Sequence, residues 1–200
     1  MANNYTDAQL ERAFIEVGGH LLELHARWKL FRKLYRGNED SQPILKEVAS
    51  EMFWLLGRLL HRGSLLLFRQ LTDGPLTSGR RNASLEGMLK AVAGDSYLTT
   101  EPDLMKELDA ARQNKAIRDH GNKYIAHLDL DLLAGVAAPP TSIEIEEFEN
   151  ALSHMRTFAN GMASKFFGGL ERDFAEEAEL MTRQADILVG TLKNGLVKEH

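Results

Sequence analysis

A long periodic run of apolar residues near the start of the chain constrains the fold more than any other feature. Its members recur at alternating spacings of four and three residues: Leu10, Phe14, Val17, Leu21, Leu24, Trp28, Phe31 and Tyr35. On a helix such positions form one continuous seam, which is buried by packing lengthwise on another helix. Thr6 and Gln9 have the spacing of a capping box at its beginning. The run therefore predicts a long helix within a helical bundle.

The remainder of the chain is predicted to form further helices, because turn-forming residues separate its apolar segments. In chain order, these helices are expected over residues 43–71, 84–93, 103–129, 141–167 and 172–193. Thr100 with Asp103, and Thr141 with Glu144, have capping-box spacing. No segment has the two-residue period of a strand. The fold class predicted is all-α, an up-and-down bundle of five to six helices with at least two long ones.

Length and composition favour a single domain over residues 1–200. The absence of cysteine excludes disulfides and thiolate zinc sites and fits a reducing compartment. No apolar stretch approaches the roughly 20 residues needed to span a bilayer. We expect a soluble, cytoplasmic protein without a membrane partner.

The net charge of −5 is unevenly distributed along the chain. Residues 1–100 carry 13 Lys and Arg against 11 Asp and Glu, whereas residues 101–200 carry 11 against 18. A polyanion would prefer the first half, where the segment RWKLFRKLYR gathers five basic residues between Arg27 and Arg36. Two interpretations of this segment stay open: a polyanion-binding surface, or the solvated face of an amphipathic helix.

The second expected helix is so apolar that it is predicted to be surrounded by other helices. Its exceptions are Arg58, Arg62 and Arg69, which fall along one stripe of the helix. Buried arginines require partners, and Asp73 is four residues beyond Arg69. The arginines either form structural ion pairs, as Arg69 would with Asp73, or bind phosphate.

Two histidines in the segment IRDHGNKYIAHLDLD are candidates for chemistry. His120 and His127 are two helical turns apart, roughly 10 Å along the axis, so they point the same way but cannot ligate one metal ion together. No metal site and no cofactor are predicted. Read alone, His127 also suits the C-terminal end of a helix, where it would interact with the helix dipole and nearby aspartates.

Four segments together resemble a known family. GNKYIAHLD resembles the motif of HEPN domains, and WKLFRKLY, FRQLTD and NASLEGML resemble the branch of AbiU-type abortive-infection proteins. The resemblance covers roughly residues 20–130 and divides the chain into a HEPN-like core over 1–135 and C-terminal helices over 141–200 that complete the bundle. It implies a homodimer with a metal-independent ribonuclease site where two copies of the motif meet.

The resemblance also assigns residues to that site. His127 matches the family histidine and Asn122 the polar residue after the family arginine, but Gly121 stands where that arginine is expected. Metal-free RNA cleavage needs a base with a pKa near neutrality and a cation to hold charge on the phosphate. His127 is the candidate base, and the substitutes for the missing cation are His120, Lys123, Arg62 and Arg69.

Two functions remain open from the sequence. One is an RNA-directed protein of the phage-defence or toxin type, in which a weakened metal-independent endoribonuclease mainly binds RNA or a nucleotide. The other is a non-enzymatic helical interaction or regulatory protein, antitoxin-like, with a partner from a neighbouring gene. Whether the chain is an enzyme is left open.

Overall fold

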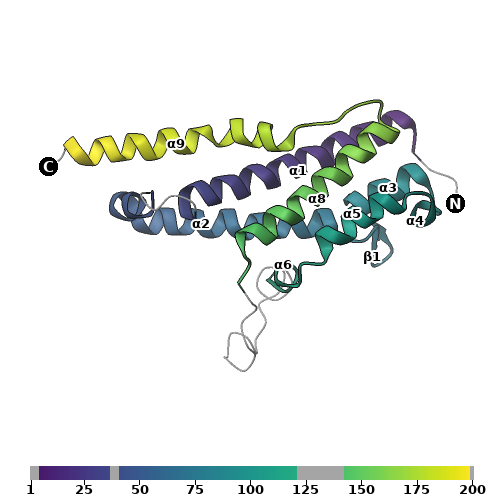
Figure 1. Ribbon diagram of the computed structural model, residues 1–200, viewed down its shortest axis with the longest axis horizontal. Helices are drawn as coiled ribbons and strands as arrows, with labels where there is room; N and C mark the ends of the chain where they lie inside the picture. Colours follow the sequence, from purple (N-terminus) through teal and green to yellow (C-terminus); the bar gives the residue numbers. More distant parts are fainter. Residues whose placement is uncertain (1–4, 37–40, 121–141, 199–200) are drawn as a thin grey trace, which may run out of the picture. The chain divides into compact units, whose positions relative to one another are not determined.

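A computed structural model describes residues 5–36, 41–120 and 142–198, and the all-α prediction is confirmed (Figure 1). The described residues form α1 (Asp7–Tyr35), α2 (Ser41–Thr72), α3 (Leu85–Ala93), α4 (Tyr97–Thr100), α5 (Pro102–Arg112), α6 (Lys115–His120), α8 (Ile145–Phe166) and α9 (Phe174–Lys198). These eight helices exceed the five to six expected, since α4 lies in a predicted loop and one predicted helix is divided. None of the described helices is long and apolar enough to cross a membrane.

A two-stranded ribbon follows α2 and was not predicted. β1 (Leu76–Thr77) pairs antiparallel with β2 (Arg80–Arg81) across a two-residue turn. The turn residues Ser78 and Gly79 both have positive φ, 50° and 78°, which is the backbone twist that a tight hairpin prefers. Strands of two residues are too short to show a two-residue periodicity, so the sequence pattern could not predict this ribbon.

The long first helix predicted from the apolar seam is confirmed as α1. Leu21 and Leu24 are completely buried, and Val17 and Trp28 are each 2% exposed. The capping box at its start is confirmed, because Thr6 N donates to Gln9 Oε1 at 2.9 Å and Gln9 N donates to Thr6 Oγ1 at 3.3 Å.

The chain divides into two compact units, each built from two stretches of sequence. Unit 1 comprises Met1–Leu21 with Leu65–Arg172, and unit 2 comprises Leu22–Ser64 with Asp173–His200. In unit 1, α8 packs along α5 (Figure 1). The α8 side chains Phe148 and Phe158 are completely buried there, and the Phe148 ring lies 5.4 Å from that of Phe68.

Unit 2 joins α9 to the second half of α1 and the first part of α2. Leu34, Leu45, Phe53 and Ala185 form its buried apolar cluster. Tyr35 Oη donates to the Phe53 carbonyl at 2.6 Å. An apolar cluster shared by three helix segments holds this unit together.

The expectation that other helices surround α2 was wrong for one of its faces. Met52, Leu55 and Leu59 are 58%, 52% and 60% exposed. In unit 2 the opposite face of α2 is the one that packs, with Phe53 in the apolar cluster and the Tyr35 ring close to Gly57. The backbone at Ala49 is also non-helical (φ −161°, ψ 72°), so α2 is kinked there.

The helix predicted over residues 103–129 is interrupted at Asn114. The Asn114 Oδ1 accepts a hydrogen bond from Ile117 N at 2.9 Å and so caps the beginning of α6. Gln113, at the end of α5, therefore does not share a continuous helix face with His120 of α6. The capping box of Thr100 and Asp103 was also wrong, because Glu101 precedes α5 and no side chain caps this end.

Candidate functional site

The candidate site begins at the C-terminal end of α2, where Arg69 and Asp73 lie one helical turn apart. Arg69 Nε is 4.0 Å from Asp73 Oδ1, the outer limit for an ion pair, and both side chains are more than a third exposed. Arg69 Nη1 is buried and has no hydrogen-bond partner among the described residues. The structural ion pair, one of the two interpretations that the sequence left open, is therefore present but loose.

Arg112, at the end of α5, holds the C-terminal end of α2 in place. Its Nε donates to the Thr72 carbonyl at 2.7 Å, and its Nη2 donates to the Asp73 carbonyl at 3.1 Å. The last carbonyls of a helix have no partner within the helix, so Arg112 supplies the missing donors. The backbone that carries Asp73 is thereby fixed to α5.

Glu86 of α3 completes this arrangement as the carboxylate partner of Arg112. Arg112 Nη2 donates to Glu86 Oε2 at 2.6 Å, and Tyr97 Oη donates to Glu86 Oε1 at 2.5 Å. Glu86 is only 7% exposed. Burial, followed by the hydrogen bond to Glu86, raises the pKa of Tyr97 to about 12. We refer to Arg112, Glu86 and Tyr97 as the buried polar network.

The buried polar network is not predicted from the sequence, although the sequence carries one signal of it. Glu86 is the only charged residue among the first five of α3, between Leu85 and the buried Met88 and Leu89. A carboxylate on the apolar side of a short helix requires a buried partner. The sequence did not reveal that Arg112, 26 residues later, is that partner.

The loop between α2 and α3 is fixed by the NASLEGML segment. Asn82 Nδ2 donates to the Gly74 carbonyl at 2.8 Å, and Asn82 N donates to the Pro75 carbonyl at 3.0 Å. Ser84 Oγ accepts from Gly87 N at 3.1 Å and caps the beginning of α3. NASLEGML is thus hydrogen-bonded to Gly74 and Pro75, the two residues that directly follow FRQLTD.

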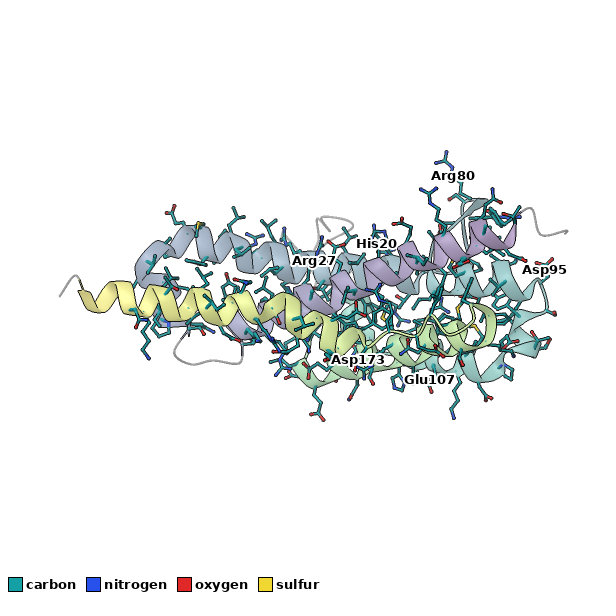
Figure 2. All side chains as sticks on the ribbon, turned by 90° about the horizontal axis from the view of Figure 1, so that it is seen from above. His20, Arg27, Arg80, Asp95, Glu107 and Asp173 are labelled. Atoms are coloured by element: carbon teal, nitrogen blue, oxygen red, sulfur yellow. The ribbon has the colours of Figure 1, made fainter. Side chains whose placement is uncertain are left out.

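The ribbon presents two further arginines in unit 1. Arg80 is exposed and extends away from the ribbon into solvent (Figure 2). Arg81 is also exposed, and its guanidinium carbon lies 5.3 Å from the centre of the Tyr5 ring. Together with Arg69, they give unit 1 three cations whose charge is accessible to a polyanion.

The basic segment of α1 is engaged by α9 instead. Lys29 Nζ lies 3.2 Å from Glu179 Oε2, and Lys33 Nζ lies 2.7 Å from Asp186 Oδ2 and 2.9 Å from Glu179 Oε1. The Asp186 hydrogen bond raises the pKa of Lys33, and the Lys33 hydrogen bond lowers that of Glu179. These two lysines face internal carboxylates, which makes them weaker candidates for an external polyanion.

The remaining predicted site residues are placed only in part. Arg62 is exposed on α2, in unit 2, and forms no ion pair with the residues that the structure describes. His120 is half-buried at the end of α6. His127, Asn122, Lys123 and Gly121 lie outside the described residues. Among the described residues, no three His, Asp or Glu side chains are grouped to hold a metal ion.

Comparison with known proteins identifies one matching family model. No match is found among curated proteins or among solved structures. A family model described as HEPN_AbiU2, AbiU2, matches residues 7–186, which include α1 through the first half of α9. The match extends well beyond residues 20–130, where the resemblance was recognised, and includes the C-terminal helices. The chain therefore belongs to the AbiU2 family of HEPN-type abortive-infection proteins.

Proposed function

We propose that this protein is an RNA-directed effector that binds the RNA backbone with Arg69 and cleaves RNA weakly, without a metal, as a homodimer. The observation that carries the proposal is the state of Arg69. Within the described part of the chain, its one ion pair is at 4.0 Å and its buried Nη1 has no acceptor, while the side chain as a whole is 37% exposed. An arginine that is held only by a loose ion pair and is partly exposed suits a phosphate group, whose oxygens accept parallel hydrogen bonds from the exposed edge of a guanidinium.

The buried polar network supports this role by fixing the backbone at Asp73. Because Arg112 is tied to α2, α3 and α5, the turn of helix that carries Arg69 has little freedom to move. A cation held on a rigid element loses less conformational entropy on binding than a cation on a mobile loop. Arg62, Lys123 and Asn122 are the further phosphate contacts in this proposal.

Catalysis in the proposal depends on His127 as the base that activates a ribose 2′-hydroxyl. The sequence has Gly121 where the family arginine would stabilise charge on the phosphate. Loss of one such donor costs about 10²–10³ in rate. Binding should therefore be easier to detect than cleavage, with His120 and Lys123 as substitute cations.

The binding experiment replaces Arg69 by Met and measures the affinity for a fluorescent single-stranded RNA by anisotropy over a series of salt concentrations. Loss of one phosphate contact should weaken binding about tenfold and reduce the steepness of the salt dependence by about 0.7. Arg12→Met, at an exposed arginine of α1, is the matched control and should change neither. If Arg69→Met lowers the melting temperature but leaves affinity unchanged, Arg69 has a structural role only.

The cleavage experiment incubates several RNAs with the protein in EDTA. His127→Ala should abolish whatever cleavage is present, and Gly121→Arg should increase it. Each variant is also melted, since a larger side chain at position 121 can destabilise the fold by overpacking. A folded Gly121→Arg protein that leaves every RNA intact would refute the nuclease part of the proposal.

The exposed apolar face of α2 favours one alternative, a non-enzymatic interaction or regulatory protein of the antitoxin type. Met52, Leu55 and Leu59 offer a surface for another protein and have no role in RNA binding. A stable complex with a protein from a neighbouring gene, together with no measurable RNA affinity, would favour this alternative.

A further inference from the structure

The middle of α2 carries a row of large apolar side chains that no other described part of the chain covers. Met52, Leu55 and Leu59 follow at spacings of three and four residues, so they point to one side of the helix, and each is more than half exposed. We call these three residues the α2 stripe. Single exposed apolar residues are normal on a protein surface, but a row at helical spacing indicates a contact with another helix.

Charged residues along one flank of the α2 stripe have a definite order. At 100° per residue, Glu51, Arg58 and Arg62 fall on the same flank, with the acid towards the N-terminal end and the two bases towards the C-terminal end. All three residues are exposed. Arg58 is also positioned, because its guanidinium carbon lies 4.6 Å from the centre of the Trp54 ring.

This order is self-complementary when two copies of the helix run in opposite directions. In an antiparallel pair related by a two-fold axis, equivalent flanks face each other. If the two-fold axis passes near Leu55, Glu51 of each copy lies opposite Arg58 of the other. Their offset along the helix axis is then roughly 1.5 Å, the rise of one residue. A parallel pair would instead set this flank against the opposite one, which carries Leu56 and Gly63 and no charge.

We propose that a second copy of this chain covers the α2 stripe, with the two α2 helices antiparallel and crossing near Leu55. The stripe supplies the apolar contact, and two symmetric Glu51–Arg58 pairs set the direction and register. The proposal deepens the homodimer in the proposed function by naming its surface. It is argued from α2 alone and does not depend on RNA cleavage.

The first experiment measures molar mass by light scattering on a size-exclusion column between 1 and 100 μM. The parent should elute at about twice 22.5 kDa. Leu55→Glu places a charge at the centre of the stripe and should give a monomer. Leu98→Glu is the matched control, because Leu98 is 56% exposed on α4 in unit 1, and this variant should remain dimeric.

The second experiment tests direction by charge reversal. Glu51→Arg and Arg58→Glu should each weaken self-association at least tenfold, because both symmetric pairs become like-charged. An equimolar mixture of the two single variants should form a heterodimer as tight as the parent, and the double variant should recover self-association. Thermal melting of every variant confirms that these exposed substitutions leave the fold intact.

Two results would overturn the proposal: a monomeric parent throughout the concentration range, or a Leu55→Glu variant that is still dimeric. A dimer insensitive to charge reversal would rule out the antiparallel register. RNA affinity is measured on the same samples. Loss of RNA binding with the dimer intact would contradict the RNA-directed part of the proposed function and leave the α2 interface standing. A monomer that binds RNA would contradict the α2 interface and the homodimer, but not RNA binding through Arg69.

Discussion

Replacing Arg112 by Met should be among the most destabilising changes in unit 1. The substitution leaves Glu86 as a buried carboxylate with Tyr97 as its remaining partner, and it removes the donors to the carbonyls of Thr72 and Asp73. Breaking a buried ion pair by removing one partner costs roughly 3–5 kcal/mol. The Arg112 side chain is 26% exposed, so water partly replaces it, and we expect a loss of about 2–4 kcal/mol.

Urea unfolding followed by far-UV circular dichroism measures this loss, with Arg12→Met as the surface control. The decisive comparison is the double variant Arg112→Met, Glu86→Leu, which removes both charges. It should be more stable than Arg112→Met alone, since no unpaired carboxylate remains and only the two carbonyls of α2 lose donors. If the double variant is the less stable of the two, or if Arg112→Met behaves like the surface control, the buried polar network does not stabilise the fold as described.

Further predictions concern a close packing contact and a buried phenol. Gly87→Ala should destabilise the protein by roughly 3 kcal/mol or more, because the added Cβ would lie 2.1 Å from the Asn82 carbonyl oxygen. In Gly190→Ala, on α9, the added Cβ meets nothing within 4 Å, so this variant should be more stable by about 0.5–1 kcal/mol. Urea unfolding measures both changes. The pKa of Tyr97 is raised to about 12, so its contribution to stability is complete below the unfolded value of about 10 and is lost as the pH rises towards 12. Tyr97→Phe should remove the loss of stability at alkaline pH that is due to Tyr97. The loss due to Tyr35 should remain, because burial also raises the pKa of Tyr35. Urea midpoints measured between about pH 10 and pH 12 compare the two proteins.

The features that the sequence predicts well are those governed by local periodicity. The seam of α1, its capping box and the short helix expected over residues 84–93 all follow from residues within one or two turns of each other. Such short-range patterns determine which face of a helix is apolar. The family resemblance in FRQLTD and NASLEGML is likewise visible in the sequence, and the structure adds that Asn82 is hydrogen-bonded to Gly74, the residue after FRQLTD.

The features that were missed depend on contacts between residues distant in the chain. Arg112 and Glu86 meet across 26 residues, and Lys33 meets Asp186 across 153. Periodicity also failed where a side chain competed with the helix: Asn114 caps α6 with its own amide oxygen and interrupts a pattern that otherwise looks continuous. For α2, composition indicated burial on every side, but composition does not show how many neighbours are present to cover the helix.

Salt should separate the two interfaces proposed for this protein. RNA binding through arginines releases counterions from the phosphate backbone, so each contact contributes about −0.7 to the slope of log affinity against log salt concentration. The α2 stripe is apolar at its centre, and its two Glu51–Arg58 pairs lie at the rim, where screening removes only a modest attraction. Between 50 and 200 mM NaCl, three phosphate contacts predict that the RNA affinity falls about twentyfold. Over the same range the association constant of the dimer should fall by less than about threefold, which corresponds to a few tenths of a kcal/mol. Anisotropy and sedimentation on the same sample measure both quantities. A dimer that dissociates as steeply as the RNA complex would show that charge, rather than the apolar stripe, holds the two copies together.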